Sequence, residues 1–78
     1  MKSVLEVLTG IRPEFDFTTS QDFIADGMLD SFDVITLISE LDKRFGISIN
    51  GTDILPENVK SVAAITSLLQ KYGVDRGL

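Results

Sequence analysis

The sequence predicts an all-α protein: a small four-helix bundle with three longer helices, one short third helix and a long first loop. Three stretches repeat apolar residues at helical spacing, and each ends at or beside a glycine. The 78 residues contain no repeats, low-complexity tracts or internal linker. We therefore expect a single domain over residues 1–78, with a frayed tail at residues 74–78.

The first helix is expected over residues 2–11. Its apolar face consists of Val4, Val7, Leu8 and Ile11. The Arg12-Pro13 step ends it, because a residue that precedes proline avoids the α region. From there to about Met28 the sequence predicts a loop, whose phenylalanines and Ile24 we expect to pack on the core. A loop of this length without regular structure is uncommon and often functional.

The second helix is expected from Ser31 to Phe45. One apolar stripe runs along it at helical spacing, formed by Val34, Leu37, Ile38, Leu41 and Phe45. Gly46 is a natural helix stop, and the basic side chains just before it suit the negative end of the helix dipole. The following segment is expected to be extended or turn-like, with a turn at Asn50-Gly51.

Two further helices are expected after this turn. The segment LPENV suits one short helical turn with Pro56 at its first position. Ser61 is placed to cap a last helix over about Val62 to Tyr72, which Gly73 ends. The shared apolar face of that helix contains Val62, Ile65, Leu68, Leu69 and Tyr72.

The residue types that most often perform catalysis are missing. The chain has no cysteine and no histidine, which excludes thiol nucleophiles, Cys/His zinc sites, disulfides and a histidine base. Nothing in the sequence pairs a nucleophile with a base, and the carboxylates belong to a solvated surface. We therefore expect no catalytic residues, no metal site and a protein that is not an enzyme.

The acidic side chains are concentrated in one segment. The net charge is −5, yet residues 14–42 carry −8 and the remainder carries +3. Such a field repels nucleic acid and anionic membranes and favours basic protein surfaces, although ordinary solubilising charge is the alternative interpretation. The N-terminal segment lacks the apolar stretch of a signal peptide, and no apolar run approaches the roughly 20 residues of a membrane span. We expect a cytoplasmic monomer without direct membrane insertion.

The segment DSFD at the start of the second helix has a simple structural interpretation. Asp30 is the N-cap of the helix, and Asp33 adds favourable charge to its first turn. Ser31 then occupies the first helical position with its hydroxyl near the rim of the bundle. A serine at such a position is more often structural than functional.

Helix phasing adds an observation that capping does not explain. With the apolar stripe turned inward, Phe32 and Ile35 lie off it and are expected to be partly exposed. Beside an acidic surface and a hydroxyl at a helix start, they form a candidate docking patch. The alternative is that the loop residues Phe23 and Ile24 fold over them.

The run FIADGMLDSFDVITLISELDKRF resembles the acyl carrier proteins, also called phosphopantetheine-binding domains. Their signature is a glycine, a short interval, and then Asp-Ser-Leu or Asp-Ser-Met opening the second helix. Gly27, Leu29, Asp30 and Ser31 match this signature, and Phe32 takes the Leu/Met place. The resemblance covers residues 2–72, because the helix lengths, the long first loop, the short third helix and the acidic balance also fit.

The resemblance implies that a phosphopantetheinyl transferase attaches 4′-phosphopantetheine from coenzyme A to Ser31. The arm would carry acyl or aminoacyl groups as thioesters and present them to partner enzymes of fatty-acid, D-alanylation, polyketide or nonribosomal peptide type pathways. The other implied partners are an acyl- or aminoacyl-loading ligase and synthases or acyltransferases with basic docking surfaces. The implied partner-facing residues are Asp30, Phe32, Asp33, Ile35 and Glu40, with Asp33 and Glu40 on the outward side of the second helix.

The chain departs from fatty-acid-type carriers at three places. Those carriers have further acids one turn after the motif and near the end of the second helix, where this chain has Thr36, Lys43 and Arg44. The pattern is closer to D-alanyl carrier proteins and to stand-alone carriers of peptide or polyketide pathways. The alternative from another class is an unmodified, small acidic helical module that binds a basic partner.

Overall fold

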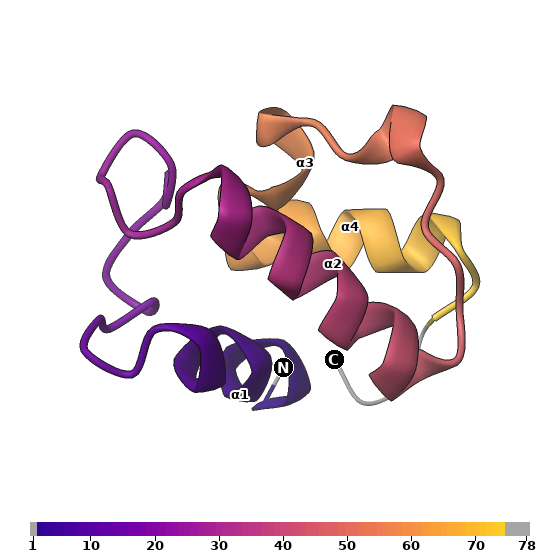
Figure 1. Ribbon diagram of the computed structural model, residues 1–78, viewed down its shortest axis with the longest axis horizontal. Coiled ribbons are helices and arrows are strands. Elements are labelled where there is room, and N and C mark those ends of the chain that lie inside the picture. The colour runs from indigo at the N-terminus through magenta and orange to yellow at the C-terminus, as the bar shows by residue number, and fades with distance from the viewer. Residues whose placement is uncertain (1, 75–78) are drawn as a thin grey trace.

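The computed structural model describes residues 2–74, which contain four α-helices and one 3₁₀ turn (Figure 1). The elements in chain order are α1 (Lys2–Ile11), α2 (Ser31–Phe45), η1 (Gly51–Asp53), α3 (Pro56–Val59) and α4 (Val62–Lys71). No strand occurs within these described residues. The predicted all-α class is confirmed, with three longer helices, a short third helix and a long first loop. The last helix ends one residue earlier than predicted, because Tyr72 is its C-cap.

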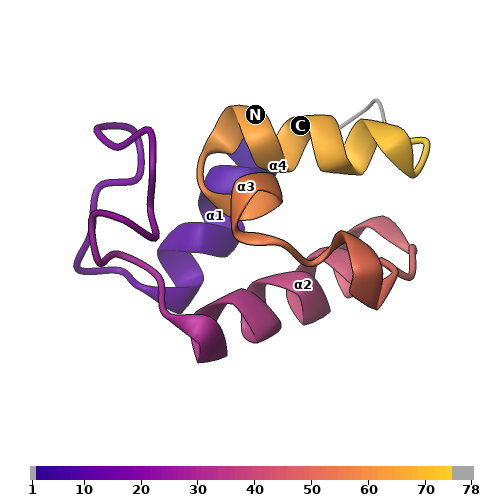
Figure 2. The same cartoon turned by 90° about the horizontal axis from the view of Figure 1, so that it is seen from above.

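The helices pack around one apolar core. α1 packs against both α2 and α4, and α3 packs against α4. Seen from above, α2 and α4 lie on opposite sides of the molecule with α3 between them (Figure 2). The largest fully buried side chains are Phe23, Leu8, Leu37, Leu41, Ile65, Leu69, Val4 and Val59. The buried face of α2 is the predicted stripe, although Val34 and Phe45 at its two ends are only partly buried.

Local capping chemistry sets the limits of α2 and α4. Asp30 accepts a hydrogen bond from the Asp33 amide at 2.9 Å, and Ser61 accepts one from the Ala64 amide at 3.0 Å. Gly46 ends α2 in the left-handed conformation, with φ at 65°. A residue with a side chain adopts that conformation only at a steric cost, which explains why α2 stops at a glycine. These are the caps and the stop that the sequence predicts.

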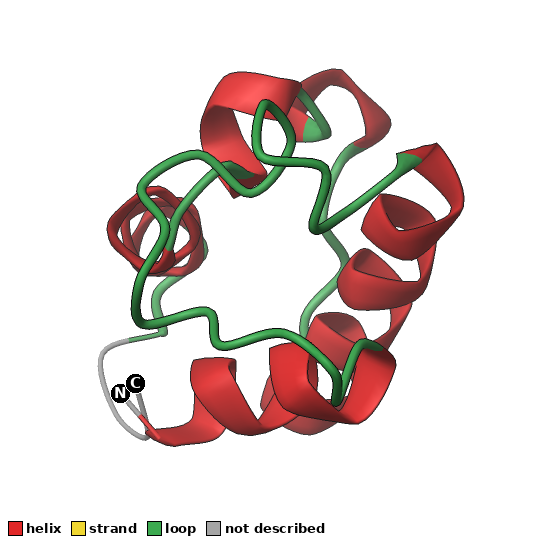
Figure 3. Cartoon of the chain, turned by 90° about the vertical axis from the view of Figure 1, so that its left-hand side faces the viewer, coloured by secondary structure: helices red, strands yellow, loops and turns green. Residues whose placement is uncertain are grey.

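The long loop between α1 and α2 closes one end of the bundle, the end that faces the viewer in Figure 3. The rings of Phe17 and Phe23 are buried and meet edge to face, with their centroids 5.0 Å apart. The Phe23 amide also donates to the Lys60 carbonyl at 2.6 Å, which ties the loop to the junction of α3 and α4. Met28 and Leu29, next to α2, are buried as well. The loop is thus packed on the core, as predicted, and it holds the start of α2 in place.

The chain after α4 differs from the expectation. Val74 does not belong to a frayed tail: its side chain is buried, and its amide donates to the Leu69 carbonyl at 3.0 Å. An apolar side chain that reaches the core is retained there because burial removes its surface from water. The rest of the expected tail, residues 75–78, lies outside the described residues.

Candidate functional site

Ser31 is the first residue of α2, and its side chain is exposed at the surface. The capping bonds of this helix use Asp30 and Asp33, and no side chain or backbone group among residues 2–74 makes a hydrogen bond to the Ser31 hydroxyl. The amides of Ser31 and Phe32 belong to the first turn, where no preceding helical carbonyl accepts them. An unbonded hydroxyl therefore lies beside free N–H groups at the positive end of a helix dipole.

Asp30 and Asp33 form a reciprocal capping box around Ser31. The Asp30 carboxylate accepts from the Asp33 amide at 2.9 Å, and the Asp33 carboxylate accepts from the Asp30 amide at 3.2 Å. Each side chain thus satisfies one amide of the first turn. The sequence predicted the Asp30 N-cap and the favourable charge of Asp33. It did not predict the second bond of the box, which the Asp33 carboxylate accepts from the Asp30 amide.

The expectation that Asp33 faces outward is wrong. Its side chain is only 14% exposed, and the Arg12 Nε donates to its Oδ2 at 2.8 Å. Burial opposes ionisation of the Asp33 carboxyl, but the hydrogen bonds from Arg12 and from the Asp30 amide outweigh this, so its pKa is lowered. The Asp33 side chain turns toward the end of α1 because the Arg12 guanidinium lies there, on the residue that directly follows α1. Helix phasing within α2 alone contains no information about that partner.

The apolar patch next to Ser31 is exposed, as the phasing predicts. Phe32 is 79% exposed and Ile35 is 64% exposed. The alternative that Phe23 and Ile24 cover them is wrong, because both patch residues remain exposed: Phe23 packs wholly into the core, and Ile24 only lines the groove beside Ile35. A third exposed residue, Leu55, is 41% exposed and precedes α3.

A mostly apolar groove of about 340 Å³ runs from Ser31 along α2 toward α3. Ser31 is one of its lining residues, so the hydroxyl opens directly beside the groove. Its other lining residues are Ile24, Val34, Ile35, Ile54, Leu55, Pro56 and Val59. The groove joins the start of α2 to the segment before α3, two parts of the chain that the sequence does not connect.

The sequence interpretation missed Ile54 and Leu55 as parts of this site. From the sequence, LPENV is assigned to one short helical turn, and Pro56 at the first position is sufficient to explain that turn. The available signal was the apolar pair directly before Pro56, which a short polar helix does not need for its own start. That signal shows an apolar surface but not which helix the surface meets.

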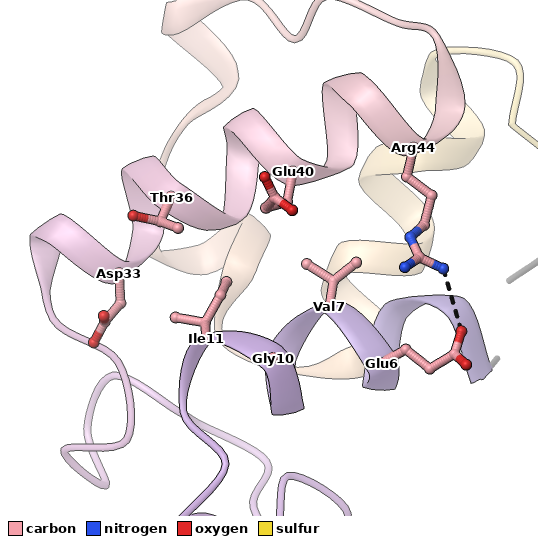
Figure 4. Close-up of a pocket in the computed structure, with 8 residues that line it drawn as sticks. All are labelled: Glu6, Val7, Gly10, Ile11, Asp33, Thr36, Glu40 and Arg44. Atoms are coloured by element: carbon pink, nitrogen blue, oxygen red, sulfur yellow. Dashed lines mark hydrogen bonds and ion pairs between the residues drawn. The ribbon is translucent and has the colours of Figure 1, made fainter.

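Glu40 is exposed on α2, as expected, and is paired with Lys43 at 3.3 Å. Arg44 reaches across to Glu6 of α1 at 3.2 Å, which is the contact drawn in Figure 4. Glu6, Glu40 and Arg44 border a cleft of about 470 Å³ between α1 and α2. Glu40 and Glu6 thus each have a basic partner of their own, whereas Asp30 near Ser31 shares the single cation Arg12 with Glu14 and Asp33.

Two further properties of residues 2–74 bear on the site. No helix in this part of the chain combines the length and apolar character needed to cross a membrane. Within the same described residues, no group of three or more His, Cys, Asp or Glu side chains is arranged to hold a metal ion.

The chain matches the phosphopantetheine attachment site family over residues 1–69, which is most of its length. The chain belongs to this family. Its members are carriers rather than catalysts, and their cofactor is covalently bound 4′-phosphopantetheine. No match was found among curated proteins or among solved structures. The resemblance identified from the motif around Ser31 is therefore confirmed at the level of the family.

Proposed function

We propose that this phosphopantetheine carrier is an acyl carrier protein whose attachment residue is Ser31. The observation that carries the proposal is the exposed, unbonded hydroxyl at the first position of α2, framed by an Asp30 cap. Ser31 also lies within the matched family region and within the Asp-Ser motif. The carrier acts as a cosubstrate of its partner enzymes, and we place it in the cytoplasm with its coenzyme A donor.

The proposed attachment is one group transfer. Ser31 Oγ attacks the phosphorus that bears pantetheine in coenzyme A, and a new P–O bond forms to Oγ. The P–O bond to the nucleotide breaks and adenosine 3′,5′-bisphosphate leaves. A general base of the transferase takes the hydroxyl proton, because the sequence contains no histidine and no base among residues 2–74 is bonded to Ser31.

The residues around Ser31 fit the attached group. The free first-turn amides and the helix dipole favour a phosphodiester at this position. The apolar groove beside the hydroxyl offers a surface along which an arm and its cargo can lie. When bound, the cofactor supplies a thiol that holds an acyl or aminoacyl group as a thioester. A carrier without cysteine thereby gains the reactive sulfur that its own sequence lacks.

We propose that partner enzymes dock on the exposed surface around the attachment residue. Phe32, Ile35 and Leu55 supply its apolar centre, while Asp30 and Glu40 supply exposed carboxylates. Exposed ion pairs contribute about 0–1 kcal/mol each, so the carboxylates should govern encounter rate and partner choice more than affinity. Asp33, which was expected to contact partners directly, instead orients the start of the helix from within the capping box.

We propose that the carrier serves a D-alanylation, peptide or polyketide pathway rather than housekeeping fatty-acid synthesis. The support is the charge at the end of α2, where Lys43 and Arg44 neutralise Glu40 and Glu6. At the Ser31 end three carboxylates, those of Glu14, Asp30 and Asp33, share the single cation Arg12, so a partner with a long basic docking surface would find surplus acidic charge mainly there. Its loading enzyme is accordingly a ligase that activates an acyl or aminoacyl group.

The test is intact mass after incubation of the chain with coenzyme A and a promiscuous phosphopantetheinyl transferase. We expect the mass to rise by one phosphopantetheine in the wild type and to stay unchanged in Ser31→Ala. Circular dichroism establishes that this variant is folded. If the mass of the wild type does not increase, the carrier function is refuted, and the remaining candidate is an unmodified acidic module that binds a basic partner.

A further inference from the structure

We propose that Arg12 is a positioning residue for the attachment reaction at Ser31. This inference rests on the proposed function and concerns a side chain that lies nineteen positions before the attachment residue. Arg12 directly follows α1, and its amide still donates to the Leu8 carbonyl at 3.0 Å. Pro13 comes next and fixes the direction in which the chain leaves the helix. The backbone of Arg12 is therefore anchored before its side chain makes any contact.

The Arg12 guanidinium bonds to both members of the capping box. Its Nε donates to Asp33 Oδ2 at 2.8 Å, and its Nη2 lies 3.5 Å from Asp30 Oδ2. The same Asp33 oxygen accepts the Asp30 amide, and the other Asp30 oxygen accepts the Asp33 amide. One planar cation thus links the two residues that bracket Ser31 and Phe32. Arg12 lies at the α1 end of the long loop, and the two aspartates lie at its α2 end. The guanidinium therefore connects the two ends of this loop.

This cluster differs from the ordinary surface ion pairs of the protein. Isolated exposed pairs contribute little, whereas several hydrogen-bonded charges in a network hold a defined geometry. The Asp33 side chain is 14% exposed and that of Arg12 is 36% exposed, so solvent competes only partly with their bond. Glu14 completes the network at 3.4 Å from Arg12 Nη1.

The contacts of Arg12 with Asp30 and Asp33 matter for attachment because they fix the first turn of α2, and Ser31 is the first residue of that turn. If Arg12 is removed, Asp33 loses the partner that turns it toward α1, and two carboxylates face each other around the helix start. The backbone turn that carries Ser31, and with it the position of the Ser31 hydroxyl, is then less fixed. Attachment in another protein's site needs that position to be defined, since small misplacements of a reacting group slow group transfer.

Arg44 provides a matched control. Arg44→Ala removes a cation that also ties α2 to α1, through Glu6 at 3.2 Å, but at the opposite end of α2 from Ser31. Arg12→Ala and Arg44→Ala change the net charge equally. Arg12→Lys retains the charge but has no fork with which to bond both aspartates.

The experiment measures kcat and KM of phosphopantetheine attachment for the full chain, together with amide hydrogen exchange at Asp33 in the unmodified chain. We expect Arg12→Ala and Arg12→Lys to lower kcat by roughly tenfold, the equivalent of losing one cap. Arg44→Ala should stay within about twofold of the wild type, since its contact is remote from the helix start. The Asp33 amide should exchange faster in both Arg12 variants, with the amides of the α4 core unchanged.

Three results would overturn the proposal. The first is a kcat of Arg12→Ala equal to that of the wild type. The second is an equal decrease of kcat in Arg12→Ala and Arg44→Ala. The third is a wild-type kcat in Arg12→Lys, which would show that the positive charge at this position is sufficient for attachment. If Arg12→Ala does not fold, Arg12→Lys and its Asp33 exchange decide. A wild type that is not modified refutes the proposed function instead, so the two failures are distinguishable.

Discussion

The exposed ring of Phe32 allows docking to be separated from folding with one substitution, Phe32→Ala. The ring is 79% exposed, so folding removes only about a fifth of its surface from water. A phenylalanine has roughly 200 Å² to bury, so this amounts to about 40 Å² and about 1 kcal/mol of stability at most. An aromatic ring at the centre of an interface contributes about 2 kcal/mol or more to binding, the equivalent of roughly a 30-fold change.

We therefore expect Phe32→Ala to lower kcat/KM for phosphopantetheine attachment by roughly 30-fold or more, with a loss of at most about 1 kcal/mol in the free energy of unfolding. The assay is the time course of the mass gain at several carrier concentrations, paired with urea unfolding followed by circular dichroism. Both measurements use the unmodified full chain.

Phe45→Ala at the other end of α2 is the matched control. Phe45 is partly buried against the core, so its truncation should lower stability more than that of Phe32. At a temperature where it remains folded, its kcat/KM should equal that of the wild type. The reasoning is refuted if Phe32→Ala is modified as fast as Phe45→Ala, or if it destabilises the fold as much.

Two further predictions concern stability. Leu41→Ala should lower the free energy of unfolding by about 2–5 kcal/mol, because Leu41 is fully buried. The control is Glu40→Gln at the exposed neighbouring position, which should change this free energy by less than about 0.5 kcal/mol. Urea unfolding measures both variants, and a loss below about 1 kcal/mol for Leu41→Ala would contradict the assignment of Leu41 to the core. The folded-state pKa of the Asp33 carboxyl lies below its ordinary value of 3.8, so its stabilisation is present above that value and is lost as the pH falls through the folded pKa. Acid unfolding of Asp33→Asn should therefore depend less steeply on pH in that range, and an unchanged slope by circular dichroism would show that the bond to Arg12 is not maintained in solution.

The sequence by itself determined the local framework of this protein. The limits of α2 follow from Asp30 and Gly46, because a side-chain cap and a left-handed glycine act within one turn of the helix. The exposure of Phe32 and Ile35 follows from helical periodicity alone. The Asp-Ser motif in this frame was sufficient to identify the family that the comparison confirms.

Only the tertiary structure decided which side chains meet around Ser31. The Asp33 side chain turns to Arg12, and Leu55 reaches the same groove as Ser31. Each of these contacts joins residues that are about twenty or more positions apart in the sequence, and the path of the intervening chain determines where they lie. Caps and periodicity are set by neighbours within a turn or two, whereas these partners are set by how the long loop and the segment before α3 pack on the core.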